Sequence, residues 1–165
     1  MWKIVKWTVI VVAAVLIAAG YLFSTWHHHG QSAVRINCAG NLKMIGLALR
    51  MYASDNDGFL PRDLYSLVAK GYAEAPKLYF CPEVKHDSPK EFPTRVSFKT
   101  DYHYAWTPGV RWDGPDAATR IVALDCAGNH KNYGNVLFAD GHVKGFAGYE
   151  WYREAGFDRV PQRTR

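Results

Sequence analysis

Acidic side chains are missing from the first third of the chain, and Asp55 is the first acidic residue. The residues before it include five basic ones: Lys3, Lys6, Arg35, Lys43 and Arg50. The rest of the chain is balanced, with 15 basic and 15 acidic side chains. It therefore lacks the concentrated basic face of a nucleic-acid-binding domain, and we predict no nucleic-acid partner. The early positive charges fit the flanks of a membrane span.

Signatures of catalytic sites are also missing. The sequence has no Gly-x-Ser-x-Gly elbow, no His-Glu-x-x-His motif and no phosphate-binding loop. Its three cysteines form no Cys-x-x-Cys pair, which argues against haem attachment, thioredoxin chemistry and a zinc ribbon. Asp101 and Asp125 lie on or beside expected strands, and nothing in the sequence pairs them. A thiol enzyme built on Cys126 and His130 is an alternative, but a buried thiol at a strand end is inert. We therefore predict a protein that is not an enzyme and has no cofactor.

Charge is absent again between Trp7 and Trp26, where almost every residue is apolar. About twenty residues at 1.5 Å rise span the hydrocarbon core, so residues 7–26 are expected to contact the membrane. Trp7, Tyr21 and Trp26 stand where interfacial aromatic residues are expected. Lys3 and Lys6 precede the span, so the positive-inside rule predicts a cytoplasmic N-terminus and an extracytoplasmic head.

A cleaved signal peptide is the alternative interpretation of this segment, with the small residues 18–20 as the cleavage site. The apolar run continues through residues 21–23, which favours an uncleaved anchor. His27, His28 and His29 follow the run. Adjacent imidazoles bind transition metals weakly, but neighbouring residues of one helix do not converge on a point. We therefore interpret them as a polar linker; a tag remnant is another explanation.

A second helix is expected after a break at Gly30, with Ser32 as its N-cap. Apolar residues then recur at helical spacing and form one stripe. These residues are Cys38, Leu42, Ile45, Leu49 and Tyr52. The helix is expected to end near Ser54, before the polar residues 55–58. Those four residues resemble the start of a calcium loop, but residue 66 is Ser where an EF-hand has Glu, so a helix-terminating loop is predicted.

The remaining pattern predicts a short helix between Pro61 and Gly71, a loop at 74–94 and then strands. Apolar and polar residues alternate from Val96 to Trp106, which predicts one strand, and Ile121–Leu124 form a second, more buried one. Two further apolar runs, Asn135–Ala139 and His142–Phe146, flank Asp140-Gly141. This pattern predicts a β-hairpin with a type I′ turn, because Asp-Gly supplies positive φ at both central positions.

These elements predict an α+β fold, with a long N-terminal helix packed on an antiparallel β-sheet head. The first half of the helix would cross the membrane, and its second half would be amphipathic. The expected divisions are an anchor and linker at 1–30, the amphipathic helix and loop at 31–58, the β-rich head at 59–146 and a C-terminal tail at 147–165. The tail is expected to be partly disordered at its end.

Three motifs, in order, resemble those of a bacterial family. His130, nine residues and then Asp140-Gly141 resemble the closing motif of membrane-anchored, pilin-like proteins, the prepilin-type processing-associated proteins with an H-X9-DG domain. The segment 35–61 resembles the helix and following loop of these proteins, and residues 79–82 resemble their Cys-Pro segment. The resemblance covers roughly residues 34–146. It implies a fold like that of type IV pilins and of type II secretion pseudopilins.

One departure from the pilin pattern concerns assembly. Pilin-type subunits have a leader that ends in Gly, followed by Phe and, four residues on, by Glu within the apolar helix. This sequence has no such leader and no acid before Asp55. Leader processing, N-methylation and standard pilin assembly are therefore not expected, whereas a permanently anchored pilin-like head fits.

The resemblance also suggests site residues. Cys38 and Cys81 lie in family-like motifs, so it implies a disulfide between them; Cys126 is left as a core thiol or as the alternative partner of Cys81. His130, Asp140 and Gly141 carry the family motif, and Asp140-Gly141 is first of all a turn. His130, Asp140 and His142 would bind a metal only if the preceding loop folds back, and hydrogen bonding to the hairpin or its loop is the expected role of His130.

The function expected from the sequence is structural: a pilin-like or pseudopilin-like subunit, or an accessory, of a bacterial filament or secretion assembly. Self-association or other pilin-like subunits would be its partners, and the inner membrane or a cell-surface filament its location. The alternative is a membrane-anchored, extracytoplasmic module that binds a divalent metal or a polysaccharide near the His130 and Asp140 hairpin.

Overall fold

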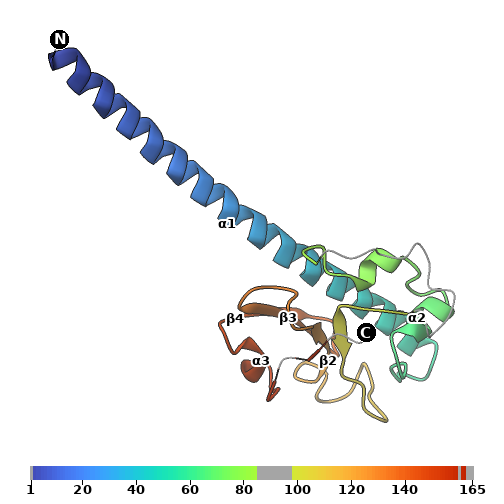
Figure 1. Ribbon diagram of the computed structural model, residues 1–165. Helices are drawn as coiled ribbons and strands as arrows, with labels where there is room; N and C mark the ends of the chain where they lie inside the picture. Colours follow the sequence, from blue (N-terminus) through green and yellow to red (C-terminus); the bar gives the residue numbers. More distant parts are fainter. Residues whose placement is uncertain (1, 85–97, 160, 163–165) are drawn as a thin grey trace. The chain divides into compact units, whose positions relative to one another are not determined.

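The computed structural model describes residues 2–84, 98–159 and 161–162. The chain divides into two compact units, Met1–Val34 and Arg35–Arg165. The second unit is called the head below. Helices and strands follow along the chain in the order α1, α2, η1, β1, β2, β3, β4 and α3 (Figure 1). The boundary at residue 34 lies close to the predicted end of the anchor at residue 30.

Helix α1 (Trp2–Ser54) contains the expected anchor. Its segment Ile4–Thr25 is long and apolar enough to cross a membrane, and the side chains of this segment are exposed. The predicted break at Gly30 is wrong, and Ser32 is not an N-cap, because α1 runs through both residues. One glycine costs a helix only about 1 kcal/mol relative to alanine, which does not end a helix with strong neighbours on both sides.

The end of α1 near Ser54 is confirmed. The Gly58 N–H donates to the Ala53 carbonyl at 2.8 Å, and Asp57 and Gly58 adopt φ of +52° and +81°. Left-handed residues of this kind satisfy the last carbonyls of a helix. Residues 55–58 are therefore a helix-terminating loop, as predicted.

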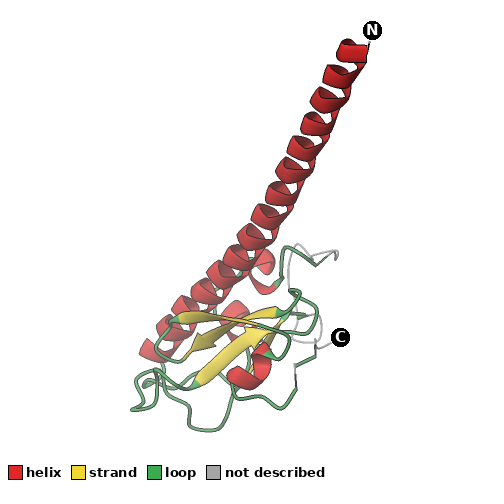
Figure 2. Cartoon of the chain, turned by 90° about the vertical axis from the view of Figure 1, so that its left-hand side faces the viewer, coloured by secondary structure: helices red, strands yellow, loops and turns green. Residues whose placement is uncertain are grey.

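The head contains a four-stranded antiparallel sheet in the order β1-β2-β3-β4 (Figure 2). Its strands are β1 (Tyr102–Tyr104), β2 (Ile121–Asp125), β3 (Tyr133–Phe138) and β4 (Val143–Ala147). An apolar N-terminal helix together with an antiparallel sheet confirms the α+β class. The buried second strand and the hairpin lie where the alternation of side chains predicted them.

The first strand is shorter than the predicted range of 96–106. Residues 98–101 are not part of a strand, and residues 96 and 97 lie outside the described residues. The Asp101 N–H donates to the Tyr79 carbonyl at 2.9 Å, so this segment bonds to the end of the helix at residues 76–79 before the strand begins. Phe98 packs against the Tyr79 ring at 5.0 Å between centroids. The alternation of apolar and polar residues before residue 102 therefore indicates which side chains are buried. It does not show that the segment pairs with another strand.

The turn between β3 and β4 also differs from the prediction. The Phe138 N–H donates to the His142 carbonyl, and the Gly141 N–H donates to the Phe138 carbonyl, so Ala139, Asp140 and Gly141 form a three-residue loop. Gly141 has a φ of +86°, whereas Asp140 is not in the left-handed region. The type I′ turn is therefore wrong, because only one position needs positive φ. A type I turn followed by a left-handed glycine is the usual three-residue hairpin.

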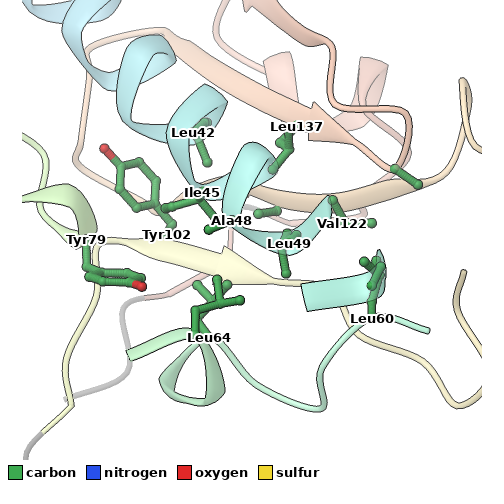
Figure 3. Packing of buried hydrophobic residues seen from close by; sticks show 14 of the residues in the cluster. Leu42, Ile45, Ala48, Leu49, Leu60, Leu64, Tyr79, Tyr102, Val122 and Leu137 are labelled. Atoms are coloured by element: carbon green, nitrogen blue, oxygen red, sulfur yellow. The ribbon is translucent and has the colours of Figure 1, made fainter. Parts of the chain in front are cut away.

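The main core lies between the second part of α1 and one face of the sheet (Figure 3). The predicted helical stripe is confirmed for four residues that are fully buried: Cys38, Leu42, Ile45 and Leu49. Tyr52 is only partly buried at the edge of the same core. The sheet contributes Val122 and Leu137, among others, while α2 (Tyr65–Ala69) and η1 (Pro76–Tyr79) close the sides with Leu67 and Tyr79.

A second core covers the other face of the sheet. Adjacent residues of β3 divide between the two, since Leu137 joins the first core and Val136 the second. Helix α3 (Trp151–Glu154) packs Trp151 against this face. The sequence did not predict α3. The segment expected as a tail, 147–165, therefore contributes Trp151 and Ala155 to the buried core. Its last residues, 163–165, lie outside the described residues.

Substituting alanine for Gly141 should destabilise the head more than the same change at Gly109. Both glycines have positive φ, which costs alanine about 1–2 kcal/mol. A Cβ on Gly141 would meet the Trp112 ring at 2.5 Å, whereas one on Gly109 meets nothing within 4 Å. Overpacking adds about 1–3 kcal/mol. Denaturant unfolding of the two variants measures the difference in the free energy of unfolding, and equal losses would contradict the contact.

Candidate functional site

Among the described residues of the head, five polar or charged ones are buried: Asp101, Asp125, Asn129, His130 and Asn135. Asp101 directly precedes β1, and the others lie on β2, on β3 and in the loop between them. Asp101 bonds to the Cys81 loop, and Cys81 contacts Cys38 of α1. Burying so many polar groups is unfavourable unless each is hydrogen-bonded. Their contacts therefore decide what this cluster can do.

The Asp125 carboxylate is completely buried at the end of β2. Its Oδ1 accepts a hydrogen bond from the Asn129 amide at 3.0 Å, and its Oδ2 accepts from the backbone and side-chain N–H groups of Asn135 at 2.7 and 3.0 Å. Burial raises the pKa of Asp125, and these hydrogen bonds oppose the rise. Asn135 also donates to the Arg35 carbonyl, so the carboxylate links the sheet to α1.

Asp101 fixes the cysteine loop in a similar way. Its Oδ2 accepts a hydrogen bond from the Cys81 N–H at 2.7 Å, and its carbonyl accepts from the Cys126 N–H and the Asn129 amide. The sequence left Asp101 and Asp125 without partners, and this is wrong. Asparagine and backbone donors hold the Asp125 carboxylate, and a backbone donor holds that of Asp101. Such donors leave no charge pattern in the sequence.

A tight turn brings His130 back to the end of β2. The Asn129 N–H donates to the Cys126 carbonyl, and Gly128 at the third position has a φ of +81°, as a type II turn requires. The His130 ring is then completely buried. Its Nδ1 lies 2.8 Å from Glu83 Oε2, while its Nε2 faces Asp125 Oδ2 at 3.6 Å and Cys81 Sγ at 4.0 Å.

The charges around His130 act on its protonation. Burial alone lowers the pKa of an imidazole, but Cys81, Asp125 and Glu83 together raise the pKa of His130 above its ordinary value. Since Nδ1 donates to Glu83, Nε2 is the atom that points at the sulfur and the carboxylate. His130 is therefore part of the buried cluster. Its contacts are with Glu83, Asp125 and Cys81, whereas the sequence predicted hydrogen bonds to the hairpin or its loop.

Cys38 and Cys81 lie side by side, with their Sγ atoms 2.9 Å apart. Both are buried thiols, and so is Cys126. The Cys38 S–H donates to Cys81, which lowers the pKa of Cys81 to about 5; His130 adds to this effect, while burial opposes it. The same contact raises the pKa of Cys38. The structure thus brings together the two cysteines of the expected disulfide, and the bond itself remains a prediction.

Asp140 and His142 belong to a separate place, the β3–β4 turn. His142 Nδ1 lies 2.6 Å from Asp140 Oδ1, and both side chains are partly exposed. Within the described residues, three potential metal ligands converge at one position only, and they are Cys38, Cys81 and His130. The candidate set of His130, Asp140 and His142, which required the preceding loop to fold back, is therefore not brought together. The sequence offered no signal that His130 would face the cysteines.

No protein-family model, curated protein or solved structure matches this chain. The similarity to pilin-like proteins with the H-X9-DG motif therefore rests on the sequence motifs. The buried cluster is interpreted below from its geometry alone.

The Asp125→Asn variant should be strongly destabilised. An amide at this position has one acceptor oxygen instead of two. Its NH2 group would therefore face an N–H donor of Asn129 or Asn135. Breaking a buried network of this kind costs about 3 kcal/mol. Asp113→Asn is the matched control, because its ion pair with Arg111 is exposed to solvent and contributes little to the stability. Denaturant unfolding compares the two, and similar losses would contradict a structural role for Asp125.

In the fully reduced protein, the thiolate absorbance of Cys81 should disappear as the pH falls through about 5. Because this folded-state pKa is depressed, the thiolate stabilises the fold above the pKa of an unfolded cysteine, and this stabilisation is lost as the pH falls through about 5. Cys38→Ala removes the main donor and should raise the pKa, whereas Cys126→Ala should leave the titration unchanged. An ordinary thiol titration in the wild type would refute this assignment.

Proposed function

We propose that this protein is a structural one: a pilin-like subunit or accessory of a bacterial surface or secretion assembly, anchored in the membrane by its N-terminal helix. The observation that carries the proposal is the combination within one chain of an apolar helical segment, Ile4–Thr25, and an α+β head whose core contains the later residues of the same helix. This is the order of parts that the sequence resemblance implies for a pilin-like protein.

The character of the polar cluster supports a structural role over catalysis. The side chains of Asp125 and His130 are completely buried, and the cluster bonds to itself and to backbone groups. A catalytic group must reach a substrate at hydrogen-bonding distance. Groups closed off from solvent and directed at one another hold the head together instead.

The absence of acids before Asp55 defines the kind of pilin-like protein we propose. A subunit that leaves the membrane for a filament core buries its amino terminus, and in pilins a glutamate neutralises this charge. Helix α1 offers no such carboxylate. A head that stays anchored, as an accessory or a base subunit, therefore fits this chain better than the repeating subunit of a long pilus.

The assembly is tested by shearing cells and examining both the released material and detergent extracts by electron microscopy and mass spectrometry. An anchored accessory is expected in the detergent extract, within a complex that contains other pilin-like proteins. Sheared filaments that contain this chain would replace the accessory role with a filament role. Single particles without any partner would contradict both versions of the structural proposal.

The orientation of the anchor has its own test. Tyr149→Cys and Trp2→Cys place an exposed thiol in the head and before the span, since these side chains are 84% and 82% exposed. The three native cysteines are buried and should not react. In cells whose outer envelope is permeable and whose inner membrane is intact, a membrane-impermeant maleimide should label the Tyr149→Cys variant and not the Trp2→Cys variant. The Trp2→Cys variant should be labelled once the inner membrane is opened. The reverse pattern would refute a cytoplasmic N-terminus.

A further inference from the structure

Cys38, Cys81 and His130 come from three distant parts of the chain, yet their ligand atoms lie within 4.8 Å of one another. We propose that these three side chains form a site for a soft divalent cation, Zn²⁺, in the reduced protein. The site goes beyond the structural function proposed above and does not depend on it.

The spacing of the ligand atoms supports a shared cation. His130 Nε2 lies 3.6 Å from Asp125 Oδ2, which is longer than a hydrogen bond, and 4.0 Å from Cys81 Sγ, the outer limit for sulfur. In a tetrahedral site with Zn–N near 2.0 Å and Zn–S near 2.3 Å, neighbouring ligand atoms stand about 3.3–3.8 Å apart. The 4.0 Å edge from His130 to Cys81 exceeds this range by a few tenths of an ångström, and every edge of the triangle of Cys38, Cys81 and His130 is at most 4.8 Å. The two sulfurs, 2.9 Å apart, must separate by less than 1 Å.

The kinds of atom select the metal. Two sulfurs and one imidazole nitrogen are ligands for zinc, whereas Mg²⁺ and Ca²⁺ prefer oxygen. The fourth position falls to a water molecule or to the Asp125 carboxylate, which lies 3.6 Å from His130 Nε2 but outside the group of ligand atoms that converge within 4.8 Å.

The surroundings are also those of a metal site. His130 Nδ1 lies 2.8 Å from Glu83 Oε2, and a carboxylate on the distal ring nitrogen is the usual outer partner of a zinc-bound histidine. This contact fixes the tautomer whose Nε2 lone pair points at the cysteines. The Asn129 and Asn135 amides hold the Asp125 carboxylate in the same manner.

Zinc here would be structural. All three ligands are buried, so the site is closed to substrates. The metal would connect α1, the loop after η1 and the turn between β2 and β3. A Cys38–Cys81 disulfide would occupy the same sulfurs and would exclude the metal.

The test uses the full-length chain in detergent, fully reduced and stripped of metal with a chelator. Zn²⁺ is expected to bind with one ion per chain and to raise the Tm. Co²⁺ in its place should give the intense sulfur-to-cobalt absorption and the visible bands of a tetrahedral thiolate site. This signature reports ligation by cysteine in the wild type, without relying on any variant.

Two variants test the ligands, and two others serve as controls. Cys81→Ser and His130→Gln should weaken Zn²⁺ binding by at least about tenfold and alter the cobalt spectrum, with circular dichroism as the check on folding. Cys126→Ser is the matched control for a buried cysteine outside the site and should bind as the wild type does. The triple variant His27→Asn, His28→Asn and His29→Asn should also leave the sulfur-to-cobalt band unchanged.

Two results would overturn the site. The first is a reduced, folded protein that binds no Zn²⁺ and gives no sulfur-to-cobalt band, which would leave the pair of cysteines to the disulfide alone. The second is metal binding that disappears when residues 27–29 are replaced and survives in Cys81→Ser, which would place the ion on the histidine run.

Discussion

The buried carboxylate of Asp125 is the constraint on which the head depends. An isolated charge in a protein interior is very unfavourable, so this side chain requires its donors. The required donors come from Asn129 in the turn after β2 and from Asn135 in β3, and Asn135 in turn reaches the Arg35 carbonyl in α1. Helix, sheet and turn must therefore take up one relative position for the carboxylate to be satisfied. Apolar packing provides most of the stabilisation, but it is non-directional, whereas the hydrogen bonds to Asp125 require defined partners.

The sheet separates two hydrophobic cores of unequal size, one on each of its faces. The larger core contains the stripe of α1 and one set of strand residues, and the smaller one contains α3 and the alternate set. Because side chains alternate along a strand, neighbours such as Val136 and Leu137 serve different cores. A shift of one residue in β3 would exchange the two sets and would also remove Asn135 from Asp125. The apolar pattern and the polar network thus specify the same register.

The parts of the structure that sequence reasoning predicted are those with a local period. The stripe from Cys38 to Leu49 and the runs of β2 and β3 follow from spacing alone. The polar cluster does not, because its contacts join residues far apart in sequence: 43 positions separate Cys38 from Cys81, and 100 separate Arg35 from Asn135. Only the family resemblance linked the two cysteines. The first strand was predicted too long, because the alternation near residue 100 reflects packing against η1, such as that of Phe98 on Tyr79. Helix α3 was missed, because four residues are too few to show a period.

The order of the elements along the chain has a consequence for biosynthesis. The stripe of α1 is translated first, and β2 begins at Ile121, about 70 residues after the end of the helix. At about 5–20 residues per second, the ribosome needs roughly 4–14 seconds to make the strands that cover Leu42, Ile45 and Leu49. Throughout that interval the nascent helix has an uncovered apolar face. Exposed apolar surface of this kind makes an incomplete chain prone to aggregation, so the helix that organises the finished head is the part of the nascent chain most in need of protection.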